Sequence, residues 1–319
     1  MSLTTHHLEF TCRAVTPVEL EEQPGSSVRG AVVGGLWERF CANKAALSCP
    51  ACPLVPVCPV AALIAPMRED GEPGGGQRPR PYVVRPPAAG PRRFAPGETL
   101  AFGIALIGTV APLFPYVVMA AQAIEHAGLG RRLPAGGRRG TLHVEAIAAV
   151  HPLRGARQPL YRRGTPHVAS PGLPVTPADV AAYAATLPSD RLTLRLLTPL
   201  RLVDGERLVR RFDPRPFLAR LAWRLDELAR AYGDGRPLIG PDAPRALAGR
   251  ARVAQDATRW VDVISYSTRS RQRTPIGGLV GEVTLEGDLA GLRELLVWGS
   301  LVHVGRNAVK GDGAYIVVA

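Results

Sequence analysis

Apolar residues follow two periods along this chain: the alternation typical of strands and the three-to-four-residue spacing typical of helices. In the first half they predict strand, helix, two strands, helix and strand over residues 4–15, 27–42, 81–85, 98–108, 115–127 and 141–150. The second half repeats that order over residues 191–203, 214–232, 258–267, 278–286, 288–298 and 313–318. Two βαββαβ units in tandem predict an α+β chain with two ferredoxin-like (RRM-like) domains.

The predicted domains are residues 1–155 and residues 190–319, and 319 residues fit two domains of ordinary size. The first domain carries a Cys-rich insertion at residues 41–62, and the second carries a glycine-rich loop near its end. A connection rich in Pro and Arg at residues 151–190 joins the two domains, and its pattern leaves its structure open. One helix has an evident core face, made of Phe217, Leu221, Leu225 and Leu228.

One uncharged stretch, residues 99–124, is long enough to span a bilayer. Glycines in its first half and Pro112 and Pro115 in its middle favour a strand followed by a helix over a membrane span. Residues 1–15 lack the basic and apolar regions of a signal peptide. Five cysteines, an odd number, favour a reducing environment over a disulfide framework, so we expect a cytoplasmic protein.

The chain is strongly basic, with 39 basic and 27 acidic residues and a net charge of +12. Lys44 and Lys310 are the only lysines, so the other 37 of the 39 cations are arginine. A GC-rich coding sequence explains arginine in place of lysine, but it does not explain the excess of positive charge. Because the arginine guanidinium suits phosphate oxygens, the excess predicts a polyanionic partner.

The first basic cluster lies between residues 128 and 163, which hold eight arginines and one acid, Glu145. Its core, GLGRRLPAGGRRG, interleaves glycine with the RNA-binding candidates Arg131, Arg132, Arg138 and Arg139. Glycine lets the backbone approach a phosphate and arginine neutralises its charge. The alternative is a solvated loop that joins a helix to a strand.

The second cluster, SYSTRSRQRTPIGG at residues 265–278, contains Tyr266 and no acid. Its arginines Arg269, Arg271 and Arg273 alternate, so an extended segment would direct them to one face. A basic row beside an aromatic ring is typical of a single-stranded RNA track, where Tyr266 stacks on a base.

The third cluster is GSLVHVGRNAVKGDGAY at residues 299–315. His303 stands directly before a glycine-rich loop that contains Arg306 and Lys310. A lone histidine in an apolar run is usually structural. A proton-transferring group beside a phosphate-binding loop is nevertheless what phosphodiester chemistry needs.

The runs SYSTRSRQRTPIGGLVGEVTLEGDL and LLVWGSLVHVGRNAVKGDGAYIV resemble the C-terminal signature of the CRISPR-associated repeat-RNA endoribonucleases, the Cas-six type within the RAMP superfamily. The resemblance is specific over residues 260–319. It is weaker in the first half, where SSVRGAVVGGLWERF resembles the first helix of the family and GLGRRLPAGGRRGTLHV its first glycine-rich loop. The family has two ferredoxin-like domains, which agrees with the order of elements above.

The resemblance implies metal-independent cleavage of precursor CRISPR RNA within each repeat, with no cofactor for catalysis. The 2′-hydroxyl of the RNA attacks the adjacent phosphorus and leaves a 2′,3′-cyclic phosphate and a 5′-hydroxyl. In these roles we expect His303 as acid or base, Lys310 and Arg271 as catalytic cations, and Arg306 among the residues that bind RNA.

The chain departs from the better-known branch of the family, which carries its catalytic histidine on or just after the first helix. Residues 25–60 contain no histidine here. The alternatives to His303 are His6, His7, His143, His151 and His167, or a mechanism without a catalytic histidine. Asp312 stands where an apolar residue is expected, which would weaken phosphate binding at that point.

Four cysteines are candidate metal ligands: Cys41, Cys49, Cys52 and Cys58. The run CPACPLVPVCPV resembles a Cys cluster seen in one branch of the family. Four thiolates suit a structural zinc ion or, second, an iron–sulfur cluster, and free buried thiols are the alternative. We expect Cys12, on the first strand, to lie in the core.

Two other functions fit the same residues. One is a non-catalytic RAMP subunit that binds guide RNA in an effector complex, and the other is a basic zinc-stapled protein for a different RNA. The expected partners are CRISPR repeat RNA, other CRISPR effector subunits and a second copy of the chain in a homodimer, with no membrane.

Overall fold

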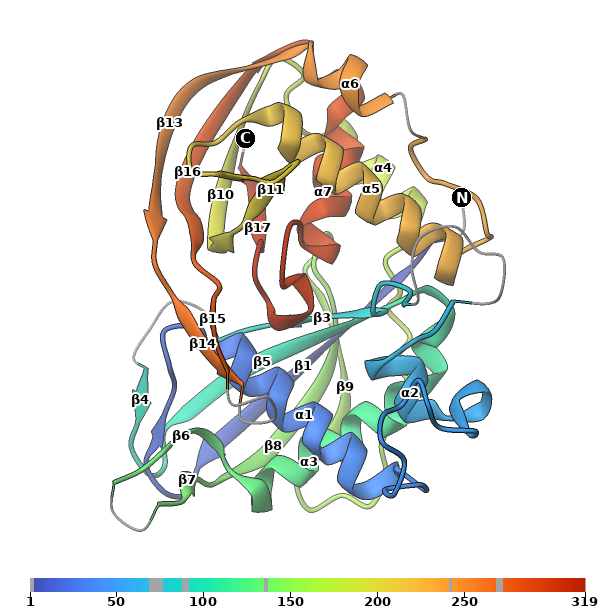
Figure 1. Ribbon diagram of the computed structural model, residues 1–319, viewed down its shortest axis with the longest axis vertical. Helices are drawn as coiled ribbons and strands as arrows, with labels where there is room; N and C mark the ends of the chain where they lie inside the picture. Colours follow the sequence, from blue (N-terminus) through green and yellow to red (C-terminus); the bar gives the residue numbers. More distant parts are fainter. Residues whose placement is uncertain are drawn as a thin grey trace. The chain divides into compact units, whose positions relative to one another are not determined.

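The computed structural model describes residues 3–68, 77–87, 92–134, 137–240, 243–267 and 272–318 (Figure 1). Two compact units divide the chain: an N-terminal unit, Thr5–Pro174, and a C-terminal unit, Val175–Ala319, which also includes Met1–Thr4. Both units combine sheets with helices, so the prediction of a mixed α and β fold is confirmed.

The N-terminal unit contains a five-stranded antiparallel sheet in the order β3-β5-β1-β8-β9. Its strands are β1 (Thr5–Ala14), β3 (Tyr82–Arg85), β5 (Thr99–Ile107), β8 (Leu142–His151) and β9 (Ala156–Arg162). Helices α1 (Pro24–Phe40) and α3 (Phe114–Ala127) pack against each other on one face of it (Figure 1). The remaining elements are short: β2 (Val18–Glu19), η1 (Val55–Val57), α2 (Pro59–Ile64), β4 (Arg93–Phe94), η2 (Gly108–Leu113), β6 (Leu129–Arg132) and β7 (Arg139–Gly140).

Alternating apolar side chains fill the core of this unit. Phe10 on β1 stacks on Phe102 of β5 with ring centroids 5.0 Å apart. Cys12 is fully buried, as predicted. Gly35 lets the two helices approach closely, because a Cβ there would lie 2.6 Å from the carbonyl oxygen of Ala120 on α3. The helices therefore cover the sheet as one tightly packed layer.

The C-terminal unit contains a four-stranded antiparallel sheet in the order β13-β16-β10-β17. These strands are β10 (Arg191–Leu200), β13 (Ala251–Val261), β16 (Gly278–Gly287) and β17 (Tyr315–Val318). The helices are α4 (Pro177–Ala185), α5 (Pro214–Tyr232), α6 (Ala243–Ala248) and α7 (Arg293–Val302). Two hairpins and two short turns complete it: β11 (Leu202–Asp204) with β12 (Arg207–Val209), β14 (Ile264–Ser267) with β15 (Gln272–Pro275), η3 (Ala290–Leu292) and η4 (Ala308–Lys310).

Helix α5 has the predicted bounds, and its four predicted core residues, Phe217, Leu221, Leu225 and Leu228, are fully buried. Asp213 begins the helix by accepting a hydrogen bond from the Arg215 amide at 2.9 Å, and Pro214 occupies its first turn. The local sequence thus specifies both the length and the buried face of this helix.

Two predictions of elements need correction. The connection after β8, whose structure the sequence left open, contains β9 and α4. The strand predicted over residues 258–267 is two strands, β13 and β14. The last helix begins at Arg293, after the short turn η3, and not at residue 288. Pro159 lies within β9, and the register between β8 and β9 shifts at Ile147, so β9 lacks the regular alternation that would predict a strand.

The uncharged stretch from residue 99 folds as β5, η2 and the beginning of α3. None of the helices in the described ranges is both long and apolar enough to cross a membrane.

Candidate functional site

The glycine-rich loop of the C-terminal unit begins where α7 ends at Val302. The Arg224 Nε atom donates a hydrogen bond to the Val302 carbonyl at 3.0 Å, which satisfies the last turn of the helix. The Val304 amide donates to the Gly313 carbonyl at 3.2 Å, so the loop closes on itself. Gly313 has φ +66°, and a Cβ there would collide with the Val304 carbonyl. Only glycine fits this position.

Hydrogen bonds tie the loop to the end of β10. The Thr198 hydroxyl donates to the Gly311 carbonyl at 2.7 Å and accepts from the Ala314 amide at 2.9 Å. The Gly313 amide donates to the Pro199 carbonyl at 3.0 Å, and the Arg306 amide donates to the Arg201 carbonyl at 3.0 Å. The loop therefore has one fixed shape that presents Arg306, which is exposed, at its edge.

His303, the predicted acid or base, is buried in this structure. Its side chain is only 1% exposed. The residue follows α7 directly with φ +59°, a backbone turn that directs the chain back into the core of the unit. In this conformation a phosphate in solvent cannot reach the imidazole. Lys310, at the end of η4, is half-buried.

Asp312 lies in the same loop with no exposed surface. Burial raises the pKa of its carboxyl to about 8, although Lys310, Asn307 and Arg201 all act to lower it. The group is therefore mainly protonated and neutral at pH 7. The sequence predicted that a negative charge on Asp312 would weaken phosphate binding. Because the carboxyl is mainly neutral at pH 7, it does not add that charge.

The second basic cluster forms the β14–β15 hairpin in part. Tyr266 on β14 pairs in register with Arg273 on β15, and Arg273 is exposed. Arg269 and Arg271 lie outside the described residues, as does the side chain of Tyr266. The predicted row of three arginines on one strand is thus described only at Arg273.

The first basic cluster forms the β6–β7 ribbon of the N-terminal unit, in which Arg132 pairs in register with Arg139. Several of its cations bind the protein itself. The Arg132 guanidinium donates to the Gly137 carbonyl at 2.9 Å, and the Arg139 guanidinium donates to the Gly130 carbonyl at 2.7 Å. Arg131 lies 3.7 Å from a carboxylate oxygen of Glu21. Arg138 is exposed at the end of the ribbon.

The four candidate cysteine ligands are not gathered into a metal-binding cluster among the described residues. Within the described ranges no three or more His, Cys, Asp or Glu side chains are arranged to hold a metal ion. The Cys58 thiol instead accepts a hydrogen bond from the Ala61 amide at 3.4 Å and caps α2, and the Cys52 thiol accepts from Asn43 at 3.6 Å. The thiols of Cys52 and Cys58 thus serve local partners, and the predicted zinc or iron–sulfur site at Cys41, Cys49, Cys52 and Cys58 is not supported.

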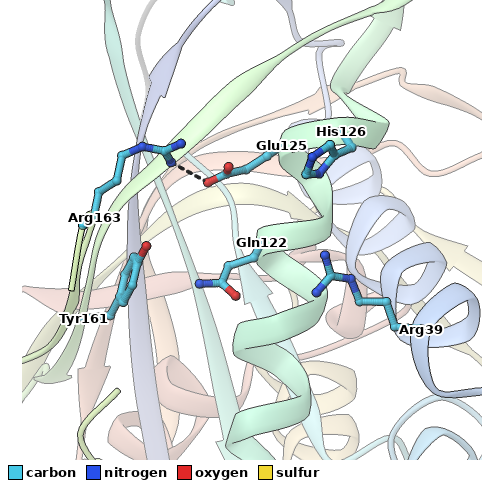
Figure 2. A pocket seen from close by; sticks show the side chains of 7 residues that line it. Arg39, Gln122, Glu125, His126, Tyr161 and Arg163 are labelled. Carbon is cyan, nitrogen blue, oxygen red and sulfur yellow. Dashed lines mark hydrogen bonds and ion pairs between the residues drawn. The ribbon is translucent and has the colours of Figure 1, made fainter. Parts of the chain in front are cut away.

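The N-terminal unit also contains a hollow of about 480 Å³ that the sequence did not predict (Figure 2). It lies between the end of α1, one face of α3 and the end of β9. Its lining consists of Arg39, Gln122, Glu125, His126, Tyr161, Arg163 and Gly164. Neither His126 nor Arg39 stood out in the sequence, because the hollow exists only once β9 lies beside α3.

An ionised carboxylate organises this hollow. Glu125 accepts hydrogen bonds from the Val144 amide and from Arg163, both at 2.8 Å, and lies 3.4 Å from the His143 ring. Burial acts to raise the pKa of Glu125, but these hydrogen bonds and the Arg163 charge outweigh it and hold the pKa below its ordinary value. The carboxylate therefore fixes Arg163 at the rim (Figure 2).

Two family models match the sequence. One, AF_1859_N, is described as an N-terminal domain and matches residues 3–173. The other is described as the CRISPR-associated endoribonuclease Cas6 and matches residues 194–315. The chain carries a Cas6 endoribonuclease domain over residues 194–315, and its first half carries the AF_1859_N N-terminal domain. The resemblance drawn from residues 260–319 is thereby confirmed.

Solved Cas6 structures share this fold. Thermus thermophilus Cas6 (TTHB231) in a product complex is 17% identical, with a TM-score of 0.56 over 98% of this chain and 100% of that one. The Cas6 protein TTHA0078 in a product complex is 16% identical, with a TM-score of 0.54 over 99% of this chain and 100% of that one. A chain of a Cas6-RT-Cas1–Cas2 complex is 12% identical, with a TM-score of 0.58 over 99% of this chain and 46% of that one. Comparison with curated proteins gives no match.

The Cas6 match places the hairpin and the glycine-rich loop in one family segment. Of the predicted site residues in that segment, Arg273 and Arg306 are exposed, Lys310 is half-buried and His303 is buried. The cations therefore fit a role in RNA binding, whereas the predicted acid or base does not.

Proposed function

We propose that this Cas6 protein cleaves CRISPR repeat RNA within precursor transcripts to give mature guide RNAs. The observation that carries the proposal is the Cas6 family match over residues 194–315, which includes the β14–β15 hairpin and the glycine-rich loop. The net charge of +12 and the exposed Arg138, Arg273 and Arg306 support an RNA substrate.

Two ferredoxin-like modules are the fold that we propose for the chain. In each unit the four strands of a βαββαβ series lie in the same order, second-third-first-fourth: β3-β5-β1-β8 and β13-β16-β10-β17. In the N-terminal unit β9 adds a fifth strand beside β8. The repeated order supports a tandem of one motif, although the sequence shows no repeat beyond the order of elements.

The proposed reaction needs no metal ion, because the nucleophile is the 2′-hydroxyl of the RNA itself. The protein has to align this hydroxyl in line with the departing 5′-oxygen, transfer two protons and offset the charge that develops on the phosphorane. The products are a 2′,3′-cyclic phosphate and a 5′-hydroxyl. Arg306 and Lys310 on the glycine-rich loop carry charge suited to binding RNA phosphates.

A non-catalytic subunit that binds guide RNA is the second candidate. The burial of His303 favours it, since a buried imidazole leaves the glycine-rich loop without an acid or base at its surface. Both candidates predict binding of repeat RNA, transfer of the bound RNA to CRISPR effector subunits, and a homodimer as one form of the protein.

Cleavage of repeat RNA distinguishes the two candidates. The wild-type protein is incubated with RNA that carries two repeats from the CRISPR array of its own genome. We expect cleavage at one position in each repeat, and no cleavage of RNA with a 2′-deoxy nucleotide before the cut. Binding without cleavage would overturn the proposal in favour of the non-catalytic subunit.

A further inference from the structure

Six of the seven histidines are poorly placed for proton transfer to RNA. His7, His151 and His303 are at most 2% exposed. His6 is half-buried on β1, and burial lowers its pKa. A group that exchanges protons with a substrate has to be within reach of it, so these four are poor candidates.

Two further histidines lack a suitable setting. The His143 ring lies 3.4 Å from a carboxylate oxygen of Glu125 and does not line the hollow. His167 is exposed on the segment after β9 and does not line the hollow. His126, in the last turn of α3, is the remaining histidine, and it is both exposed and part of the lining.

Two elements direct the lining residues into the hollow. Gln122, Glu125 and His126 stand at positions i, i+3 and i+4 of α3 and therefore share one helix face. Tyr161 lies near the end of β9 and Arg163 in the turn directly after it, and both line the hollow. Figure 2 shows the Gln122 amide between Tyr161 and Arg39, with His126 near the Arg39 guanidinium.

The charges favour an anion. Two arginines line the hollow. Glu125 neutralises the charge of Arg163, whereas Arg39 pairs with no acidic group among the described residues. The hollow therefore combines an unpaired guanidinium with a phenol, an amide and an imidazole. All of these can donate hydrogen bonds to phosphate oxygens.

We propose that this hollow binds a phosphodiester group of the RNA and that His126 is the catalytic residue that transfers its protons. The inference rests on the proposed function and names the site at which the reaction takes place. Arg39 and Tyr161 hold the phosphate oxygens, and Glu125 acts as a positioning residue because it fixes Arg163.

The step balances without a co-reactant. The bond between the 2′-oxygen and phosphorus forms while the bond between phosphorus and the 5′-oxygen breaks. His126 takes the proton of the 2′-hydroxyl and delivers a proton to the 5′-oxygen, so the imidazole returns to its starting state.

Single-turnover cleavage of the two-repeat RNA tests this site. We expect His126→Ala to lower the cleavage rate about 100- to 10,000-fold and to leave the Kd for 2′-deoxy repeat RNA unchanged. His167→Ala, the matched control, removes another exposed histidine of the same unit and keeps the wild-type rate. Arg39→Ala weakens binding of the 2′-deoxy RNA as well as lowering the rate.

Chemical rescue separates catalysis from a structural role. Added imidazole restores part of the activity of His126→Ala but none of the activity of Arg39→Ala. If wild-type protein cuts and His126→Ala cuts equally fast, this inference is wrong while the proposed function stands. If His126→Ala is inactive but imidazole does not rescue it, His126 is not the proton-transferring group. If wild-type protein does not cut, the proposed function falls, and this site with it.

Discussion

Asp312 shows how the surroundings of a residue decide its chemistry. The same carboxyl that would repel a phosphate in an open loop is neutral here, because it has no contact with solvent and its pKa is raised to about 8. An unfolded chain releases this proton near the ordinary pKa of 3.8. Between these two values the unfolded state holds fewer protons than the folded state, so the free energy of unfolding falls as pH rises.

The first prediction follows from this proton. In the wild type, ionisation of Asp312 in the unfolded chain lowers the free energy of unfolding by up to about 1.4 kcal/mol per pH unit between the two pKa values. Asp312→Asn has a neutral side chain at every pH, so it removes this loss. We expect the variant to unfold at higher urea concentration than wild type at pH 8, with a gap that closes toward pH 4. Asp204→Asn, at the exposed turn between β11 and β12, serves as control. Parallel pH dependence in wild type and Asp312→Asn would contradict the account.

Single residues also limited what the sequence could predict about the site. The apolar run around His303 was compatible with a structural or a catalytic histidine, and the burial of its side chain, which favours the structural role, depends on the fold. His126 has no neighbouring sequence signal at all. Its partners Arg39 and Tyr161 lie 87 positions before it and 35 after it, so only the fold brings them together.

At the scale of elements, the packing of α1 on α3 depends on one of two adjacent glycines. Gly35 is buried, and a Cβ there would lie 2.6 Å from the Ala120 carbonyl oxygen and 3.1 Å from the Ala123 Cβ. Gly34 is exposed, and a Cβ there would meet nothing within 4 Å. A substitution at Gly35 therefore tests the packing of α1 on α3, whereas the same substitution at Gly34 tests helix propensity alone.

The second prediction uses this pair. Gly35→Ala forces the two helices apart and lowers the free energy of unfolding by about 1–3 kcal/mol. Gly34→Ala fills open space in a helix and raises it by about 0.5–1 kcal/mol. Urea denaturation followed by circular dichroism measures both. Equal shifts for the two variants would show that the close approach of α1 and α3 does not contribute to stability.

Elements with strong local signals were predicted best. Helix α5 has its apolar spacing bracketed by Asp213-Pro214 and Gly233, and its bounds agree with the prediction. Strand β9 contains Pro159 and pairs across a register shift, so its existence depends on pairing with β8. Helix α4 had a usable signal, the capping box of Thr176 and Asp179 after Pro-rich sequence, which the apolar pattern alone did not reveal.

At the scale of the whole molecule, charge is what we expect to govern the proposed association with RNA. The chain carries a net charge of +12, and exposed arginines occur in both units, at Arg138 in the first and at Arg273 and Arg306 in the second. Other arginines are neutralised by carboxylates, as Arg157 is by Glu9 at 2.7 Å. Binding of RNA should therefore depend on a subset of the cations.

The third prediction concerns salt. If the protein neutralises about five phosphates of single-stranded RNA, raising the salt from about 50 to 200 mM weakens binding about 100-fold. Fluorescence anisotropy with 2′-deoxy repeat RNA measures the slope of log Kd against log salt. Arg138→Ala and Arg306→Ala should each make the slope shallower. A Kd that does not change with salt would contradict binding through phosphates.

The central claim is that the RNA supplies the nucleophile and the protein needs no metal ion to cleave it. Mass spectrometry of the fragments formed from repeat RNA in excess EDTA tests this most directly. We predict a 2′,3′-cyclic phosphate on the upstream fragment and a 5′-hydroxyl on the downstream fragment. Cleavage that occurs only after a divalent ion is added, and that leaves a 5′-phosphate and a 3′-hydroxyl, would contradict it.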